Sequence, residues 1–180
     1  MLAFYSVGLG ATAGGRFKLL KHLFEMRVPF GERSAVEQLL PYSAFPELSG
    51  HSRPWSIFRN SVTAVSDHIL DLLKQDAPDL AGGAADFDEL MDRFEILAAL
   101  SFAHLREPAN SPSEGIWFPP GRFVWRLRHH QSQAIKDWFG RADIERDEWP
   151  PIVGGLFSGS FARFSALRAA LLHFVDQTRW

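Results

Sequence analysis

Hydrophobic residues recur at intervals of three and four positions over most of the chain, which is the spacing of one face of an α-helix. The longest such stripe consists of Trp55, Phe58, Val62, Val65, Ile69 and Leu72. A second segment, from Asp86 to about Arg106, is apolar on almost all sides between Phe94 and Leu105. We therefore predict two long helices, the second of which is the central and most buried helix of a bundle.

Two shorter helices are predicted before these. Apolar positions between Arg16 and Met26 have helical spacing. Ser34 and Glu37 have the spacing of a capping box, in which each residue bonds a free backbone N–H at the start of a helix. The helix that begins there is expected to end at Pro41, because proline lacks the N–H that a helix interior needs.

Two further helices are predicted in the last third of the chain. The periodicity from Phe123 to Phe139 indicates a helix in one or two pieces, with Gly140 as its C-terminal stop. Ser160 is a suitable N-cap for the last helix. The inner stripe of that helix consists of Phe161, Phe164, Leu167, Leu171, Phe174 and Val175.

The remaining segments are rich in glycine and proline. Residues 5–15 are interpreted as a short extended arm that runs into a glycine-rich turn, and 79–85 as a linker. Residues 107–121 hold four of the eleven prolines and are expected to form an irregular loop. The sum is an all-α, single-domain helical bundle over residues 1–180, with five to seven helices and a short extended N-terminal arm.

The composition excludes some kinds of chemistry. The chain has no cysteine, so disulfides, thiolate nucleophiles and cysteine-ligated zinc are ruled out. The N-terminus lacks the pattern of a signal peptide, and no apolar run approaches the roughly 20 residues that span a bilayer, so a cytoplasmic location is expected. A net charge of −2 shows that the chain as a whole is not a polyanion binder.

The best candidate for a binding site is a segment that mixes basic and aromatic residues. Between positions 115 and 141 there are four arginines and one lysine against one aspartate. The candidate partner- or phosphate-binding residues are Trp117, Phe118, Arg122, Trp125, Arg126, Arg128, His129 and His130. Arginine and aromatic side chains can hold phosphates and bases, and they are also common anchors of protein interfaces. The alternative is a helix whose aromatic side faces the core while its arginines are solvated or paired with Glu145, Asp147 and Glu148.

Glycine motifs and histidine pairs do not predict a cofactor or a metal. The segment Gly8-x-Gly10 lacks the third glycine of a dinucleotide-binding turn. Neither Gly10–Gly15 nor Gly154–Gly159 is followed by the lysine of a P-loop. The adjacent histidines 129 and 130 point in different directions from a helix, which makes them a poor metal pair.

Three arginines precede a histidine at a spacing that is also used in small all-helical ribonucleases of the HEPN class. The pairs are Arg16 with His22, Arg122 with His129, and Arg168 with His173. One or two such pairs are expected by chance, and the polar residue that usually follows the arginine is absent, so we claim no family resemblance. Arg168 and His173 are the weak catalytic candidates, because they lie on a clearly predicted helix.

Three functional hypotheses follow. The leading one is a non-catalytic interaction or accessory subunit that presents the Trp117–His130 segment to a protein partner. The second is an RNA-binding helical protein, with a HEPN-like ribonuclease as its catalytic form. The third is a helical small-molecule-binding domain with a pocket near His104, which is otherwise interpreted as a buried histidine with one hydrogen-bond partner.

Overall fold

The computed structural model describes residues 1–27, 33–44, 64–76, 87–107, 116–129 and 132–177. In this part of the chain the fold is an all-α bundle, which confirms the predicted fold class. It contains nine α-helices rather than five to seven: α1 (Leu2–Ala13), α2 (Phe17–Glu25), α3 (Ala35–Ala44), α4 (Ala64–Asp76), α5 (Phe87–Arg106), α6 (Arg122–His129), α7 (Gln133–Glu145), α8 (Pro150–Val153) and α9 (Phe161–Gln177). None of the helices described here is long and apolar enough to cross a membrane.

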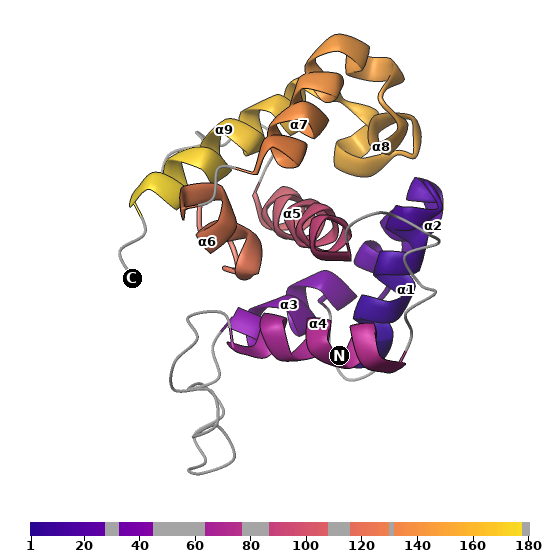
Figure 1. The fold of residues 1–180 in the computed structure, drawn as a ribbon. Helices are drawn as coiled ribbons and strands as arrows, with labels where there is room; N and C mark the ends of the chain where they lie inside the picture. Colours follow the sequence, from indigo (N-terminus) through magenta and orange to yellow (C-terminus); the bar gives the residue numbers. More distant parts are fainter. Residues whose placement is uncertain (28–32, 45–63, 77–86, 108–115, 130–131, 178–180) are drawn as a thin grey trace.

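The helix α5 is the centre of the bundle, as the sequence predicted. It packs against α1, α2, α3, α4, α6, α7 and α9, and Figure 1 shows these helices arranged around it. Thirteen of its twenty residues are buried. Acidic residues in its first turn and basic residues in its last turn favour the helix by opposing its dipole.

The predicted extended arm at the N-terminus was wrong, because residues 2–13 form α1. Phe4, Gly8 and Leu9 are buried and lie at helical spacing. Gly8 faces the ring of Phe94, and a Cβ atom there would lie only 2.1 Å from that ring. The glycine that suggested a turn is therefore the residue that lets α1 approach the central helix closely.

The helix α3 begins with the predicted capping box. The backbone N–H of Ser34 donates to Oε2 of Glu37 (3.0 Å), and the N–H of Glu37 donates to Oγ of Ser34 (3.4 Å). The predicted stop at Pro41 was wrong, since the helix continues to Ala44. Proline removes one intrahelical hydrogen bond but does not by itself end a helix.

The long stripe that begins at Trp55 is described only in part. Positions 55–63 lie outside the described residues, as does the linker over 79–85. In α4 the buried apolar residues are Ile69, Leu70 and Leu73, whereas Leu72 is half-buried. The face that packs on the bundle is thus centred about one position away from the predicted stripe.

The C-terminal third contains an aromatic core. The predicted helix over 123–139 is in two pieces, α6 and α7, and α7 continues past Gly140 to Glu145, so the predicted stop was wrong. The N-cap of α9 is confirmed, because the N–H of Arg163 donates to Oγ of Ser160 (3.2 Å). The rings of Trp138, Trp149, Phe157, Phe161 and Phe164 pack together between α7, α8 and α9.

Candidate functional site

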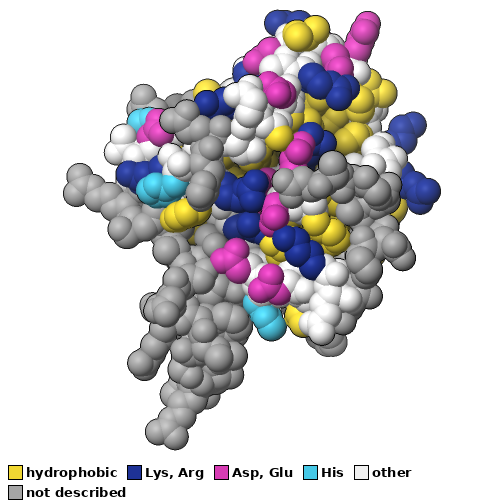
Figure 2. All heavy atoms as spheres, in the orientation of Figure 1, with side chains coloured by type: hydrophobic (Ala, Val, Ile, Leu, Met, Phe, Trp, Pro, Cys, Tyr) yellow, Lys and Arg dark blue, Asp and Glu magenta, His cyan; other side chains and the backbone are white. Residues whose placement is uncertain are grey.

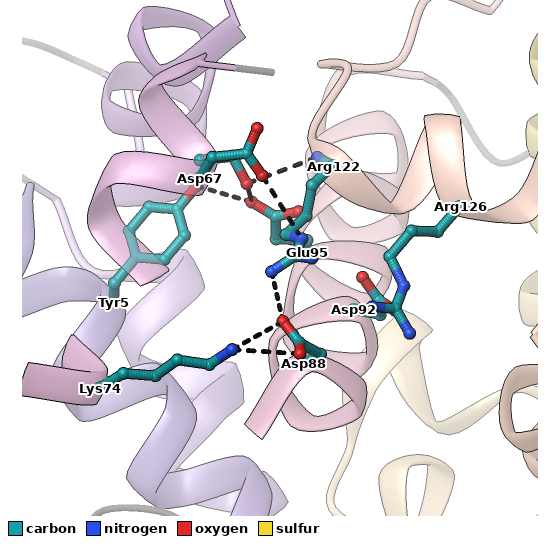
Figure 3. Close-up of polar contacts among 9 residues, drawn as sticks. Tyr5, Asp67, Lys74, Asp88, Asp92, Glu95, Arg122 and Arg126 are labelled. Carbon is teal, nitrogen blue, oxygen red and sulfur yellow. Dashed lines mark hydrogen bonds and ion pairs between the residues drawn. The ribbon is translucent and has the colours of Figure 1, made fainter. Parts of the chain in front are cut away.

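The short helix α6 carries most of the candidate residues, and the structure divides them between two faces. Phe123 and Val124 are buried against the bundle. The side chains of Arg122 and Arg126 reach toward α5 (Figure 3). Trp125, in contrast, is 37% exposed. The helix therefore uses two of its arginines internally and presents the tryptophan outward.

Three carboxylates on α5 receive the arginines. Asp88, Asp92 and Glu95 are four and three residues apart, so they lie on one face of the helix. Asp92 and Glu95 are buried, with relative exposures of 0% and 1%. Asp88 is partly exposed at the end of the row. A row of acids on the central helix is thus covered by α6.

Each arginine contacts a different carboxylate. Nη1 of Arg122 donates to Oδ1 of Asp88 at 2.7 Å. Nε of Arg126 lies 2.7 Å from Oδ2 of Asp92. The alternative expected from the sequence, in which acids near 145–148 neutralise these arginines, is replaced by pairing with acids on α5.

Two residues of α4 also contact these charged groups. Nζ of Lys74 donates to both oxygens of Asp88 at 3.0 Å. Oδ1 of Asp67 lies 3.7 Å from Nε of Arg122. We call Asp67, Lys74, Asp88, Asp92, Glu95, Arg122 and Arg126 the α5–α6 charge network (Figure 3).

Glu95 lies deepest in this network. Its Oε1 accepts hydrogen bonds from the hydroxyl of Tyr5 (3.3 Å) on α1 and from Oγ of Ser66 on α4. Gly121, just before α6, packs directly on the carboxylate, where a Cβ atom would lie 2.5 Å from Oε2. Only glycine fits at this position without a shift of the surrounding atoms.

The environment changes the acidity of the three carboxyl groups in different directions. Burial raises the pKa of Asp92 from 3.8 to about 7, against the opposing effect of Arg126. Burial also raises the pKa of Glu95 from 4.5 to about 7, although Ser66 and Arg122 favour its charged form. For Asp88 burial is outweighed by the hydrogen bond from Lys74 and by the charge of Arg122, so its pKa is lowered.

Such a network fixes geometry more than it adds stability. Removing two charges from water costs several kcal/mol for each ion, and the attraction between them offsets that cost only in part. A buried ion pair instead restricts the ways in which two elements can pack. We interpret the α5–α6 charge network as the device that sets the position and rotation of α6.

The outward face of α6 combines an aromatic residue with basic groups. The rings of Trp125 and His129 lie 4.9 Å apart, and Arg128 and His129 are exposed. Figure 2 shows basic and acidic side chains interleaved over α5 and α6, with histidine and hydrophobic side chains beside them. We call Trp125, Arg128 and His129 the α6 outer face; His130 lies outside the described residues.

The segment before α6 also divides between core and surface. Phe118 is fully buried against Phe174, with ring centroids 5.7 Å apart, so it belongs to the core. Trp117 is 38% exposed, and its ring packs edge-on against Phe102. Trp117, Phe102 and Arg106 line an open hollow of about 280 Å³.

In two of the ribonuclease-like pairs the arginine makes its contacts away from the histidine. Nη2 of Arg168 contacts Oδ1 of Asp143 on α7 at 2.7 Å, and its guanidinium lies over the ring of Phe139. His173 is exposed and lies five residues further along α9, roughly 140° around the helix. In the pair with His129, Arg122 points into the bundle while His129 is exposed.

His104 is half-buried and has two side-chain partners rather than one. Its Nδ1 accepts a hydrogen bond from Nε of Arg163 (3.4 Å), and its Nε2 lies 3.2 Å from Oγ of Ser158. Since arginine can only donate, the proton of the neutral ring is on Nε2, which donates to Ser158. Burial, together with the charge of Arg163, lowers the pKa of His104. In this tautomer the histidine cannot take a proton from the serine.

A larger groove is found away from these residues. It has a volume of about 560 Å³ between the start of α2 and α8, and its walls include Arg16, Phe17, Val153 and Gly154. It joins the ends of the two glycine-rich segments noted in the sequence, whereas His104 does not line it. The small-molecule hypothesis centred on His104 therefore gains no support from this groove.

Sequence reasoning missed the acidic half of the network. Asp92 and Glu95 lie among the apolar residues of the central helix, and their place there was the available signal. Comparisons with protein-family models, with curated proteins and with solved structures found no match to this chain. Among the described residues no cluster of three potential ligands could hold a metal ion.

Proposed function

We propose that this chain is a non-catalytic interaction subunit that binds a protein partner through the α6 outer face. The observation that carries the proposal is the division of α6. Arg122 and Arg126 anchor the helix to α5, while the neighbouring Trp125 is 37% exposed and packs against the ring of His129. A cytoplasmic setting is part of the proposal, because a chain without cysteine needs no oxidising compartment.

The area and the preorganisation of the α6 outer face favour a binding role. Tryptophan and arginine are enriched among the residues that dominate interface energies, because they bury a large area with few rotatable bonds or make several hydrogen bonds. A surface that is already fixed before binding loses less conformational entropy when the complex forms. The α5–α6 charge network supplies that fixation for the α6 outer face.

The contacts of Arg122 and Arg126 with carboxylates of α5 argue against RNA as the main partner. Phosphate recognition requires an array of cations that face outward, and each contact releases a counterion. Two of the three arginines of α6 are instead directed inward, where they contact Asp88 and Asp92. The basic segment that suggested phosphate binding in the sequence is therefore less basic at the surface than it is in the sequence.

The proposal is tested with a double variant, Trp125→Ala with Arg128→Ala, in affinity capture from the native cell. The control is Ile144→Ala with Val153→Ala, which removes two exposed apolar side chains (82% and 62% exposed) outside α6. We expect a stoichiometric protein partner to bind the wild type and the control alike. The α6 variant should bind it at least about 30-fold more weakly, because the loss of one such anchor already costs about 2 kcal/mol.

Two results would contradict the proposal. One is equal capture of every partner by the α6 variant and the control, with both variants melting near the wild-type Tm. The other is recovery of nuclease-sensitive RNA that moderate salt releases, which would indicate binding dominated by phosphate contacts. Arg126 is left unchanged, because removing it would disturb the buried network and confuse binding with folding.

A further inference from the structure

The α5–α6 charge network holds more carboxylates than cations. Four carboxylates (Asp67, Asp88, Asp92 and Glu95) face three cations (Lys74, Arg122 and Arg126) within the described residues. The hydroxyl of Tyr5 on α1 also contacts this network, because it donates to Oε1 of Glu95. Arg93 and Glu89 on α5 pair with each other.

The surroundings of Asp92 point to the place of a bound proton. Nε of Arg126 lies near Oδ2, yet neither oxygen of Asp92 accepts a hydrogen bond of good geometry from a described residue. Glu95 lies one turn further along the same buried face. Two neighbouring carboxylates without water are costly when both are charged, and protonation of one of them removes most of that cost.

We infer that α6 docks on α5 together with a proton held by the Asp92–Glu95 carboxyl pair, so that α6 opens more readily as the pH rises. This inference concerns the docking of α6 and does not require the proposed partner. Opening α6 admits water to both carboxylates, which then ionise as ordinary side chains do. Docking takes up a proton, and opening releases it.

The direction in which pH changes the opening of α6, and the pH range of that change, follow from the pKa values in the docked and opened states. In the docked state the pKa values of Asp92 and Glu95 are raised to about 7, and in the opened state they return toward 3.8 and 4.5. Between roughly pH 4.5 and pH 7 the opened state therefore binds fewer protons. Linkage then makes the opening equilibrium rise about tenfold per pH unit for each proton released, and it levels off above pH 7.

The experiment is hydrogen exchange of the α6 backbone amides between pH 5 and pH 8, corrected for the intrinsic pH dependence of exchange. We expect the protection of residues 124–129 to fall by about tenfold per pH unit for each proton released, up to about pH 7, and then to stay level. In Asp92→Asn with Glu95→Gln the dependence should disappear. In Asp143→Asn, which removes the ion pair with Arg168 between α7 and α9, it should persist.

The two exposed histidines of α4 and α6 need their own controls, because histidine titrates in the same range. His68→Gln and His129→Gln should leave the slope unchanged. Protection that is independent of pH in the wild type, or a slope that survives in the Asp92–Glu95 variant, would overturn the inference. If that variant fails to fold, the carboxyl carbon resonances of the wild type decide: titration of both groups below pH 5 would overturn it equally.

Discussion

Two glycines show how the same residue type has opposite effects in this chain. Gly121 packs on the carboxylate of Glu95, where a Cβ atom would lie 2.5 Å from Oε2 and 2.8 Å from Cδ. Gly140 lies inside α7, and nothing is within 4 Å of the position that its Cβ would take. One glycine is needed for close packing, and the other only weakens its helix.

We predict that Gly121→Ala destabilises the protein by roughly 1–3 kcal/mol, because the added methyl group must displace a buried carboxylate. Gly140→Ala should stabilise it by about 0.5–1 kcal/mol, because alanine is the better helix former. Urea denaturation measures both. A tolerated Gly121→Ala would contradict the packing of α6 described above.

At the scale of the helices, the start of α3 depends on the capping box of Ser34 and Glu37. Oγ of Ser34 accepts the N–H of Glu37, and the carboxylate of Glu37 accepts the N–H of Ser34. We predict that Ser34→Ala lowers the free energy of unfolding by about 1 kcal/mol. Ser6→Ala is the matched control, because its hydroxyl bonds only to the carbonyl of Leu2 within α1 and should contribute little. Equal losses in both variants would argue against the capping box.

The helices were largely predictable from the sequence, because helical periodicity is a local pattern. The central position of α5 and the caps at Ser34 and Ser160 were predicted correctly. Two of the errors arose where a glycine was interpreted as a turn or a helix end. Gly8 allows a close approach to Phe94 rather than a turn, and Gly140 lies within α7 without ending it.

The candidate site was only half predictable, because charge pairing is a long-range property. The basic and aromatic residues of α6 stand out in the sequence, but the sequence does not show which way each side chain points. Nothing local shows that Arg126 pairs with Asp92, 34 positions earlier in the chain, while Trp125 next to it faces outward. A buried acid on the most apolar helix was the sign that a cation had to come from elsewhere.

At the scale of the whole molecule, the charge network determines how stability depends on pH. The pKa values of Asp92 and Glu95 are raised on folding, so the stability they contribute is full below about pH 4 and is lost as the pH rises to about 7. The pKa of Asp88 is lowered, so its contribution is lost only on acidification below 3.8. The three groups together favour mildly acidic conditions.

We predict that the Tm of the wild type falls between pH 5 and pH 8 and that Asp92→Asn reduces this fall. The variant should be more stable than the wild type at pH 8, by roughly 1–3 kcal/mol, and nearly equal to it at pH 5, where Asp92 is already neutral. Asp143→Asn, at a half-exposed ion pair, should change stability by less than about 1 kcal/mol at either pH. An equal effect of Asp92→Asn on stability at pH 5 and at pH 8 would contradict the raised pKa of Asp92.

The arginines of α6 anchor the helix inward, and we propose that its outer face binds a protein partner. Photo-crosslinking in the native cell tests it most directly, with a photoreactive amino acid at position 128 on α6 and, as the control, at position 144 on α7. We predict one discrete crosslinked protein from position 128 that is lost when Trp125→Ala is added, and none from position 144. The same products from both positions, unaffected by Trp125→Ala, would contradict the claim.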